Sequence, residues 1–125
     1  MAIEIVADNV RPIGKHYCVR VVSNDTLTAG DVVYHDGTGI VVGNGGAAST
    51  ANVWGVVLQD ASAGQYVDVL VNGRVTGWTG LTAGALCYIS DTDGVLAHSA
   101  GSATFGIGWA VSTTDIYVNP NATVA

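Results

Sequence analysis

Positively charged residues are scarce in this sequence of 125 residues, in which four Lys and Arg stand against ten Asp and Glu. A protein that follows a nucleic-acid backbone needs clustered Lys and Arg to neutralise the phosphates. With a net charge of −6, we expect no nucleic-acid partner. Arg11, Lys15 and Arg20 are three of the four basic residues, so the N-terminal segment differs electrostatically from the acidic remainder.

Cysteine and long apolar runs are also scarce. Cys18 and Cys87 lie far apart and form no Cys-x-x-Cys pair, so we expect two small apolar residues in or near strands, while a disulfide between them stays open. No apolar run approaches the ~18 residues of a membrane helix, and no apolar segment follows a basic start. We expect a soluble protein without a membrane partner, made in a reducing cytoplasm.

An internal repeat is the strongest pattern that the sequence does contain. Leu-Thr-Ala-Gly at residues 27–30 returns at residues 81–84, and a tyrosine follows in the same phase at Tyr34 and at Tyr88. Such self-similarity indicates two copies of one structural unit. We expect these units at residues 27–71 and 81–118.

Short runs rich in Val and Ile, bounded by Gly, Asn and Asp, follow one another along the chain, and no window has a helical period. The sequence therefore predicts an all-β fold, a small barrel or sandwich built of the two units. Asn72-Gly73 is the strongest hairpin signal, because a type I′ turn needs positive φ at both central residues. The expected organisation is an N-terminal arm or edge strand at 1–16, one duplicated β domain at 17–118 and a C-terminal tail at 119–125.

Groups that could perform chemistry are few and lie in turns. His16, His35 and His98 each sit beside a turn or near the terminus, and no Gly-x-Ser-x-Gly motif is present. Asp-Thr-Asp-Gly at 91–94 resembles the start of a calcium loop, but the later ligands of such a loop are missing, so a tight turn is favoured. We expect no enzyme activity, no catalytic residue, no metal and no cofactor.

The aromatic residues alternate with polar neighbours in the expected strands, which favours the core or a subunit interface over a sugar-binding platform. Trp54 and Trp109 flank equivalent glycines, so we expect both indoles on equivalent faces of equivalent strands, with Tyr34 and Tyr88 in similar roles. Trp78 lies between glycines and is expected at the surface.

Residues 17–118 resemble small β-rich structural proteins of tailed bacteriophages. The similarity is to capsid decoration, or head-stabilising, proteins and to related β domains of head and tail fibres. It rests on Leu-Thr-Ala-Gly-Asp-Val-Val-Tyr, Val-Trp-Gly-Val-Val-Leu, Val-Asp-Val-Leu-Val-Asn-Gly, Leu-Thr-Ala-Gly-Ala-Leu-Cys-Tyr and Ile-Gly-Trp-Ala-Val-Ser. The resemblance implies a virion protein without catalysis that binds the major capsid protein on the outside of the assembled shell, commonly as a trimer.

Two functional hypotheses follow. In the first, the protein decorates a capsid and stabilises the shell by many modest contacts. Apolar and basic side chains of the N-terminal segment would make these contacts: Ile3, Ile5, Val10, Arg11, Lys15 and Arg20. In the second, the chain is a fibre module whose loops at 43–51 and 98–104, together with Trp78, touch a host glycan or receptor.

Overall fold

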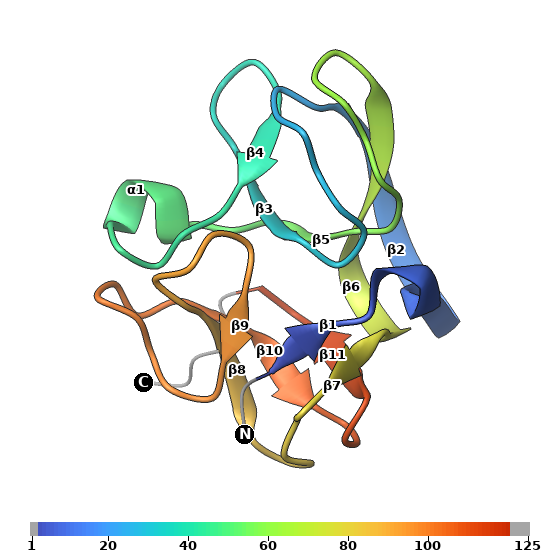
Figure 1. Ribbon diagram of the computed structural model, residues 1–125, viewed down its shortest axis with the longest axis vertical. Helices are drawn as coiled ribbons and strands as arrows, with labels where there is room; N and C mark the ends of the chain where they lie inside the picture. The colour runs from blue at the N-terminus through green and yellow to red at the C-terminus, as the bar shows by residue number, and fades with distance from the viewer. Residues whose placement is uncertain (1–2, 121–125) are drawn as a thin grey trace.

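A computed structural model describes residues 3–120 (Figure 1). Short strands follow one another along the chain, with a single 3-10 turn and one short helix among the residues described. In chain order the elements are β1 (Glu4–Ile5), η1 (Ala7–Asn9), β2 (Arg11–Val22), β3 (Val32–His35), β4 (Ile40–Val42), α1 (Ala48–Ala51), β5 (Gly55–Val57), β6 (Tyr66–Thr76), β7 (Trp78–Thr79), β8 (Leu86–Ile89), β9 (Leu96–Ala97), β10 (Gly106–Ala110) and β11 (Asp115–Val118).

Nine of these strands form one curled antiparallel sheet in the order β4-β3-β5-β6-β11-β10-β8-β9, with β2 lying beside β6. β1 and β7 pair separately as a two-stranded sheet. In Figure 1 the first unit lies in the upper half and the second unit in the lower half, with the long β6 passing from one to the other. The expected all-β fold is confirmed.

The order of strands in the sheet is a palindrome, which confirms the internal repeat. β4-β3-β5-β6 in the first unit has the same neighbours as β9-β8-β10-β11 in the second. The registers agree as well, since Gly55 lies opposite Val33 just as Gly108 lies opposite Cys87. The two units are therefore copies of one structure and not only of one sequence pattern.

The repeated Leu-Thr-Ala-Gly forms the turn that begins each unit. Its glycine has a φ of 96° at Gly30 and 85° at Gly84, the positive value that the third position of a type II turn requires. The N–H of Gly30 donates to the carbonyl of Val57 at 2.8 Å, and the N–H of Gly84 donates to that of Ala110 at 2.7 Å. Each turn is thus fixed to the third strand of its own unit.

Two clusters of apolar side chains form the interior. The smaller cluster lies in the first unit and consists of Leu27, Val33, Ile40, Val57, Ala61, Val67 and Val69. The larger cluster joins both units, because it contains Val56 and Leu70 of the first together with Ile107 and Ile116 of the second. The two units are therefore packed into one body.

The hairpin expected at Asn72-Gly73 is wrong, because β6 continues without a break from Tyr66 to Thr76. Gly73 instead lies opposite His16 of β2, with a φ of 132°. A Cβ at this position would come within 2.7 Å of the Cβ of His16. The glycine is needed for the close approach of β2, and its positive φ bends a long strand instead of reversing the chain.

The surface position expected for Trp78 is also wrong. Its side chain is 1% exposed and belongs to the larger cluster. The flanking glycines turn the chain inward at this point, where β7 pairs with β1 and places Trp78 opposite Ile5. Its Nε1 has no hydrogen-bond partner among the described residues.

Most of the N-terminal segment is part of the described fold. Ile3 is buried in the larger cluster, β1 pairs with β7, and β2 begins at Arg11 and continues past the boundary expected at residue 17. Within the expected C-terminal tail, Asn119 donates its N–H to the carbonyl of Ile107 at 2.7 Å. Positions 1–2 and 121–125 lie outside the described residues.

Candidate interaction surface

A row of partly exposed side chains crosses three strands of the second unit and continues onto β6 and β2. Direct pairing in the sheet places Leu86 of β8 beside Trp109 of β10, and Trp109 beside Tyr117 of β11. Tyr117 in turn lies beside Arg74 of β6, and Arg74 beside Ile13 of β2. Because residues that pair directly in a sheet point to the same side, these five side chains share one face, which we call the second-unit face.

The centre of the second-unit face is an aromatic pair. The rings of Trp109 and Tyr117 are stacked, with centroids 5.0 Å apart and an angle of 15° between their planes. The hydroxyl of Tyr117 donates to Oδ1 of Asn72 at 3.1 Å. Trp109 remains 37% exposed, so a large apolar surface at the centre of this face contacts water.

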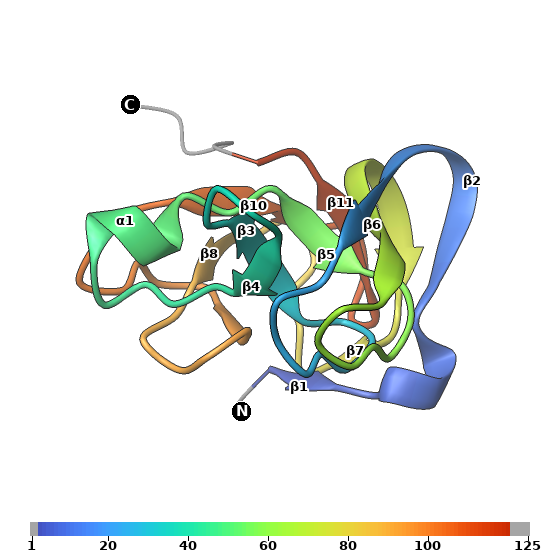
Figure 2. The same ribbon diagram turned by 90° about the horizontal axis from the view of Figure 1, so that it is seen from above.

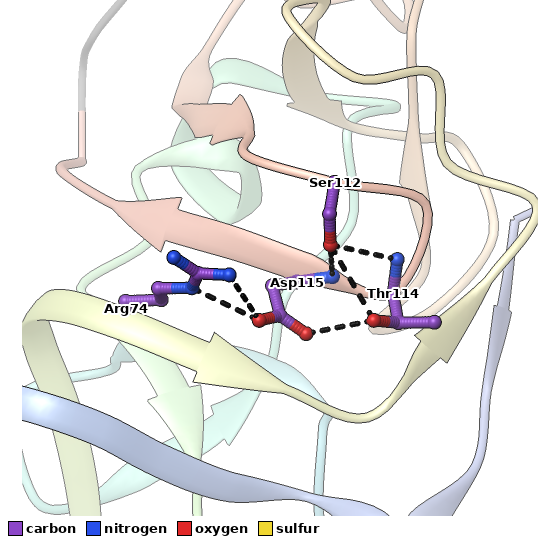
Figure 3. Close-up of polar contacts among 4 residues, drawn as sticks. All are labelled: Arg74, Ser112, Thr114 and Asp115. Atoms are coloured by element: carbon purple, nitrogen blue, oxygen red, sulfur yellow. Dashed lines mark hydrogen bonds and ion pairs between the residues drawn. The ribbon is translucent and has the colours of Figure 1, made fainter.

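Arg74, which lies opposite Tyr117 in the sheet, forms an ion pair with Asp115. Figure 3 shows this ion pair together with Ser112 and Thr114. Nη2 and Nε of Arg74 lie 2.8 Å and 2.9 Å from Oδ2 of Asp115. The other carboxylate oxygen accepts a hydrogen bond from the hydroxyl of Thr114 at 2.8 Å, and the N–H of Asp115 donates to Ser112. Burial raises the pKa of Asp115, but hydrogen bonds from Thr76, Thr114 and Arg74 and the charge of Arg74 outweigh burial and hold it below its usual value.

The same row in the first unit is buried. Its members are Val32 of β3, Val56 of β5 and Leu70 of β6, each fully enclosed, with Cys18 of β2 next in the row. Val32, Val56 and Leu70 belong to the larger cluster, which also contains side chains of the second unit. A row that one copy of the repeat buries is therefore left open in the other copy.

The two ion pairs of the described residues join corresponding strand pairs, but in different registers, since Arg20 lies directly opposite Asp68 whereas Arg74 lies opposite Tyr117 and Asp115 lies opposite Thr76. Nη1 of Arg20 lies 3.1 Å from Oδ1 of Asp68, as Arg74 lies against Asp115. Arg74 follows Arg20 at the same spacing as Leu81 follows Leu27. The repeat therefore begins one strand earlier than expected from the sequence and includes β2. The Arg-Val pair shared by residues 20–21 and 74–75 is the sequence signal for this earlier start.

The basic residues expected to bind a capsid lie along β2. Arg11, Lys15 and Arg20 are all exposed. Arg20 pairs with Asp68, whereas Arg11 and Lys15 take part in neither of the ion pairs found among the described residues. β2 pairs only with β6 and follows the outside of the molecule (Figure 2), so it presents these cations at the edge of the sheet.

The apolar residues expected beside these cations lie elsewhere. Ile3 is buried, and Ile5 and Val10 pack against the larger cluster. Ile5 fills the space beside Gly30, and Val10 fills the space beside Gly77. The structure therefore separates the three aliphatic side chains, which stabilise the fold, from the three basic ones, which face solvent.

The other predicted aromatic residues are divided between the units. Trp54 is 39% exposed and stacks on His35, with ring centroids 4.9 Å apart. Tyr34 is half-buried and packs against the larger cluster. Tyr88 is also half-buried and lies two residues from Leu86 on β8, so it belongs to the second-unit face. Trp54 and Trp109 are thus half-exposed rather than buried.

One thiol, that of Cys87, lies beside an imidazole, that of His98. Cys18 and Cys87 are free cysteines. Burial raises the pKa of the Cys87 thiol to about 12, which favours its protonated form. Nδ1 of His98 lies 3.9 Å from Sγ of Cys87 and 2.9 Å from the carbonyl oxygen of Leu86, while Nε2 of His98 accepts a hydrogen bond from the N–H of Thr82 at 2.9 Å. Within residues 3–120, no three His, Cys, Asp or Glu side chains are grouped to hold a metal ion.

The two long loops named in the second functional hypothesis meet at one end of the molecule. The N–H of Ala103 donates to the carbonyl of Gly45 at 2.7 Å, and Nδ2 of Asn44 donates to Oδ1 of Asp93 at 2.8 Å. An open hollow of about 430 Å³ lies near this junction. It is lined by Ile3, Ser90, Thr92, Val95, Leu96, Ala97, His98 and Ser99.

Comparison of the chain with protein-family models, with curated proteins and with solved structures found no match. Among the helices of the described residues, none has the length and apolar character needed to cross a membrane.

Proposed function

We propose that this protein is a capsid decoration protein of a tailed bacteriophage, which binds the outside of the assembled shell and stabilises it by repeated contacts. The observation that carries the proposal is the distribution of charge. All four basic residues lie on the neighbouring strands β2 and β6, whereas six of the ten acidic residues lie after β2 and outside β6 and β11. The edge of β2, with three of the four basic residues, is thus a strip suited to an acidic partner.

The shell partner in this proposal is the major capsid protein. Arg11 and Lys15 would face carboxylates on it, since neither is engaged in an ion pair within residues 3–120. Contacts between exposed charges are individually weak and are screened by salt. Many copies bound to one lattice would add such contacts, which is how a modest interface could stabilise a shell.

Charge-altering substitutions on β2 test the proposal. Purified shells lacking this protein are mixed with the wild type and with the double variant Arg11→Ser, Lys15→Ser, and bound protein is measured after sedimentation. We expect wild-type binding that weakens with salt, and several-fold weaker binding by the variant. Deletion of residues 2–14 is unsuitable, because β1 and the beginning of β2 belong to the fold.

A matched control keeps the net charge of the variant but leaves β2 intact. Ser62→Glu with Thr104→Glu lowers the net charge by the same two units at exposed positions away from β2. This control should bind shells like the wild type. Absence of wild-type binding, or equal loss in variant and control, would show that the proposal is wrong.

The second candidate function is a fibre module that binds a host glycan. It is favoured by the junction of the two long loops beside a hollow lined with hydroxyl groups and an imidazole. Hydroxyl and imidazole groups suit hydrogen bonding to sugar hydroxyls. Binding on a glycan array that is lost on Ser99→Tyr, which would fill the hollow, would favour this function over decoration.

A further inference from the structure

We infer that the second-unit face is the surface through which one copy of this protein contacts another copy. The inference adds a contact between copies to the shell contact proposed for β2. Only the expected number of copies in the oligomer rests on the proposed function. Three independent features of the face support a second copy as its occupant.

The first feature is that the equivalent row of side chains in the first unit is buried. Val32, Val56 and Leu70 of the first unit are fully enclosed by a cluster to which the second unit contributes. In this chain, therefore, a row of this kind is covered by apolar side chains of a neighbouring copy of the unit. Within residues 3–120 no further unit covers the equivalent row in the second unit, where Trp109 is 37% exposed.

The second feature is the change in residue type along the row. Where the buried copy has Val56 and Leu70, the open copy has Trp109 and Tyr117. Tryptophan, tyrosine and arginine are the residues enriched at the energetic centres of protein interfaces. Ile13 at 36% exposure and Val111 at 38% extend the apolar area on either side.

The third feature is charge. The row holds one charged residue, Arg74, and its partner Asp115 neutralises it at 2.8 Å. Arg11 adds a positive charge at the β2 rim of the face, because it pairs with Thr76 and Thr76 pairs with Asp115. Although the molecule has a net charge of −6, a second copy meets no excess of negative charge among the described residues of this face.

The number of copies in the oligomer indicates which surface of the second copy contacts the second-unit face. If the face meets the same face of its neighbour, the contact closes as a pair. If it meets a different patch, identical contacts can close a ring of three, the state that the resemblance implies. In both arrangements Trp109 lies at the centre of the contact.

Sedimentation equilibrium of the whole chain tests the inference. The wild type is expected to form a concentration-dependent dimer or trimer, and Trp109→Ser is expected to weaken self-association about tenfold or more. Trp54→Ser is the matched control, because Trp54 has nearly the same exposure and also stacks on an aromatic ring, but lies on the first unit. This control should associate like the wild type.

A second variant guards against loss of folding in the first. Val111→Asp places a charge at an exposed position, so the fold should persist while the contact is lost. A wild type that is monomeric at about 0.1 mM, or an oligomer indifferent to both Trp109→Ser and Val111→Asp, would overturn the inference. Shell binding by a monomeric wild type would refute the inference and support the proposed function. An oligomer that binds no shell would support the inference and refute the proposed function.

Discussion

Single residues in equivalent turns show how the two units diverged. In the first unit the N–H of Thr28 donates to Oδ2 of Asp31 at 2.9 Å. In the second unit an alanine, Ala85, stands where the first has Asp31, and the N–H of Thr82 donates to Nε2 of His98 instead. In the second unit, a histidine from a different loop thus accepts the hydrogen bond that a carboxylate within the turn accepts in the first unit.

This replacement can be reversed by substitution. His98→Ala leaves the N–H of Thr82 without its side-chain acceptor and should lower the free energy of unfolding by about 0.5–1 kcal/mol. Adding Ala85→Asp to that variant should restore the acceptor by the arrangement of the first unit. Urea unfolding of the wild type and both variants measures this, and a double variant no more stable than His98→Ala would contradict the stated equivalence.

The turn at Asp36 predicts a specific sensitivity to acid. Hydrogen bonds from the backbone N–H groups of Thr38 and Gly39, and from the side chain of Asn24, lower the pKa of Asp36 to about 2. The unfolded chain has an aspartate pKa of about 3.9 and binds the proton first, so this stabilisation is present above about pH 4 and is lost as the pH falls toward 2. Asp36→Asn should therefore lose less stability than the wild type between pH 4 and about pH 2 in thermal unfolding.

Asp31 supplies a comparison of opposite sign. Burial, and then the nearby carboxylates of Asp25, Asp60 and Asp93, raise the pKa of Asp31, although the N–H of Thr28 opposes them. A raised folded-state pKa favours the folded protein at low pH and disfavours it as the pH rises through that value. Asp31→Asn should therefore steepen the fall of stability in acid, and an equal effect of the two substitutions would contradict both assignments.

At the scale of elements, the continuous β6 depends on Gly73. An added Cβ would approach both His16 and the carbonyl of Lys15, and a φ of 132° disfavours any side chain. Gly73→Ala should destabilise the protein by about 2 kcal/mol or more in urea unfolding. Gly37→Ala is the control, because Gly37 also has a positive φ but open space around it, and an equal loss in both variants would show that the β2 contact is unimportant.

The sequence predicted those elements whose signals are local. The alternation within short strands and the exact return of Leu-Thr-Ala-Gly gave the all-β fold and the duplication, because strand and turn preferences act over a few residues. The expected turn at Asn72-Gly73 followed the same local logic and was wrong. There the pairing of β2 along β6, between residues far apart in the chain, decides the conformation.

Burial and exposure were less predictable for the same reason. Trp78 is buried because β1 returns from the N-terminus to pair with β7, which the glycines beside it do not reveal. Trp109 is open while its counterpart Val56 is closed, although the two occupy equivalent strands. Which copy of a repeated face is covered depends on how the units pack, and a single unit's sequence carries no signal for that packing.

At the scale of the whole molecule, the duplication builds two different surfaces from one unit. The first unit uses its row for internal cohesion, and the second leaves the same row open beside the basic edge of β2. On the proposals made above, copies contact one another through the open row and contact the shell through the edge. One repeated unit would then supply the contacts within the chain, the contacts between copies and the contacts with the shell.

The central claim is that this protein covers an assembled phage shell. On the proposed function the sequence is carried by a phage, and quantitative mass spectrometry of purified particles of that phage would measure the copy number of this protein relative to the major capsid protein. Decoration predicts many copies per particle, in a fixed ratio that matches positions of the capsid lattice. A particle with only a few copies, or with none, would contradict the claim.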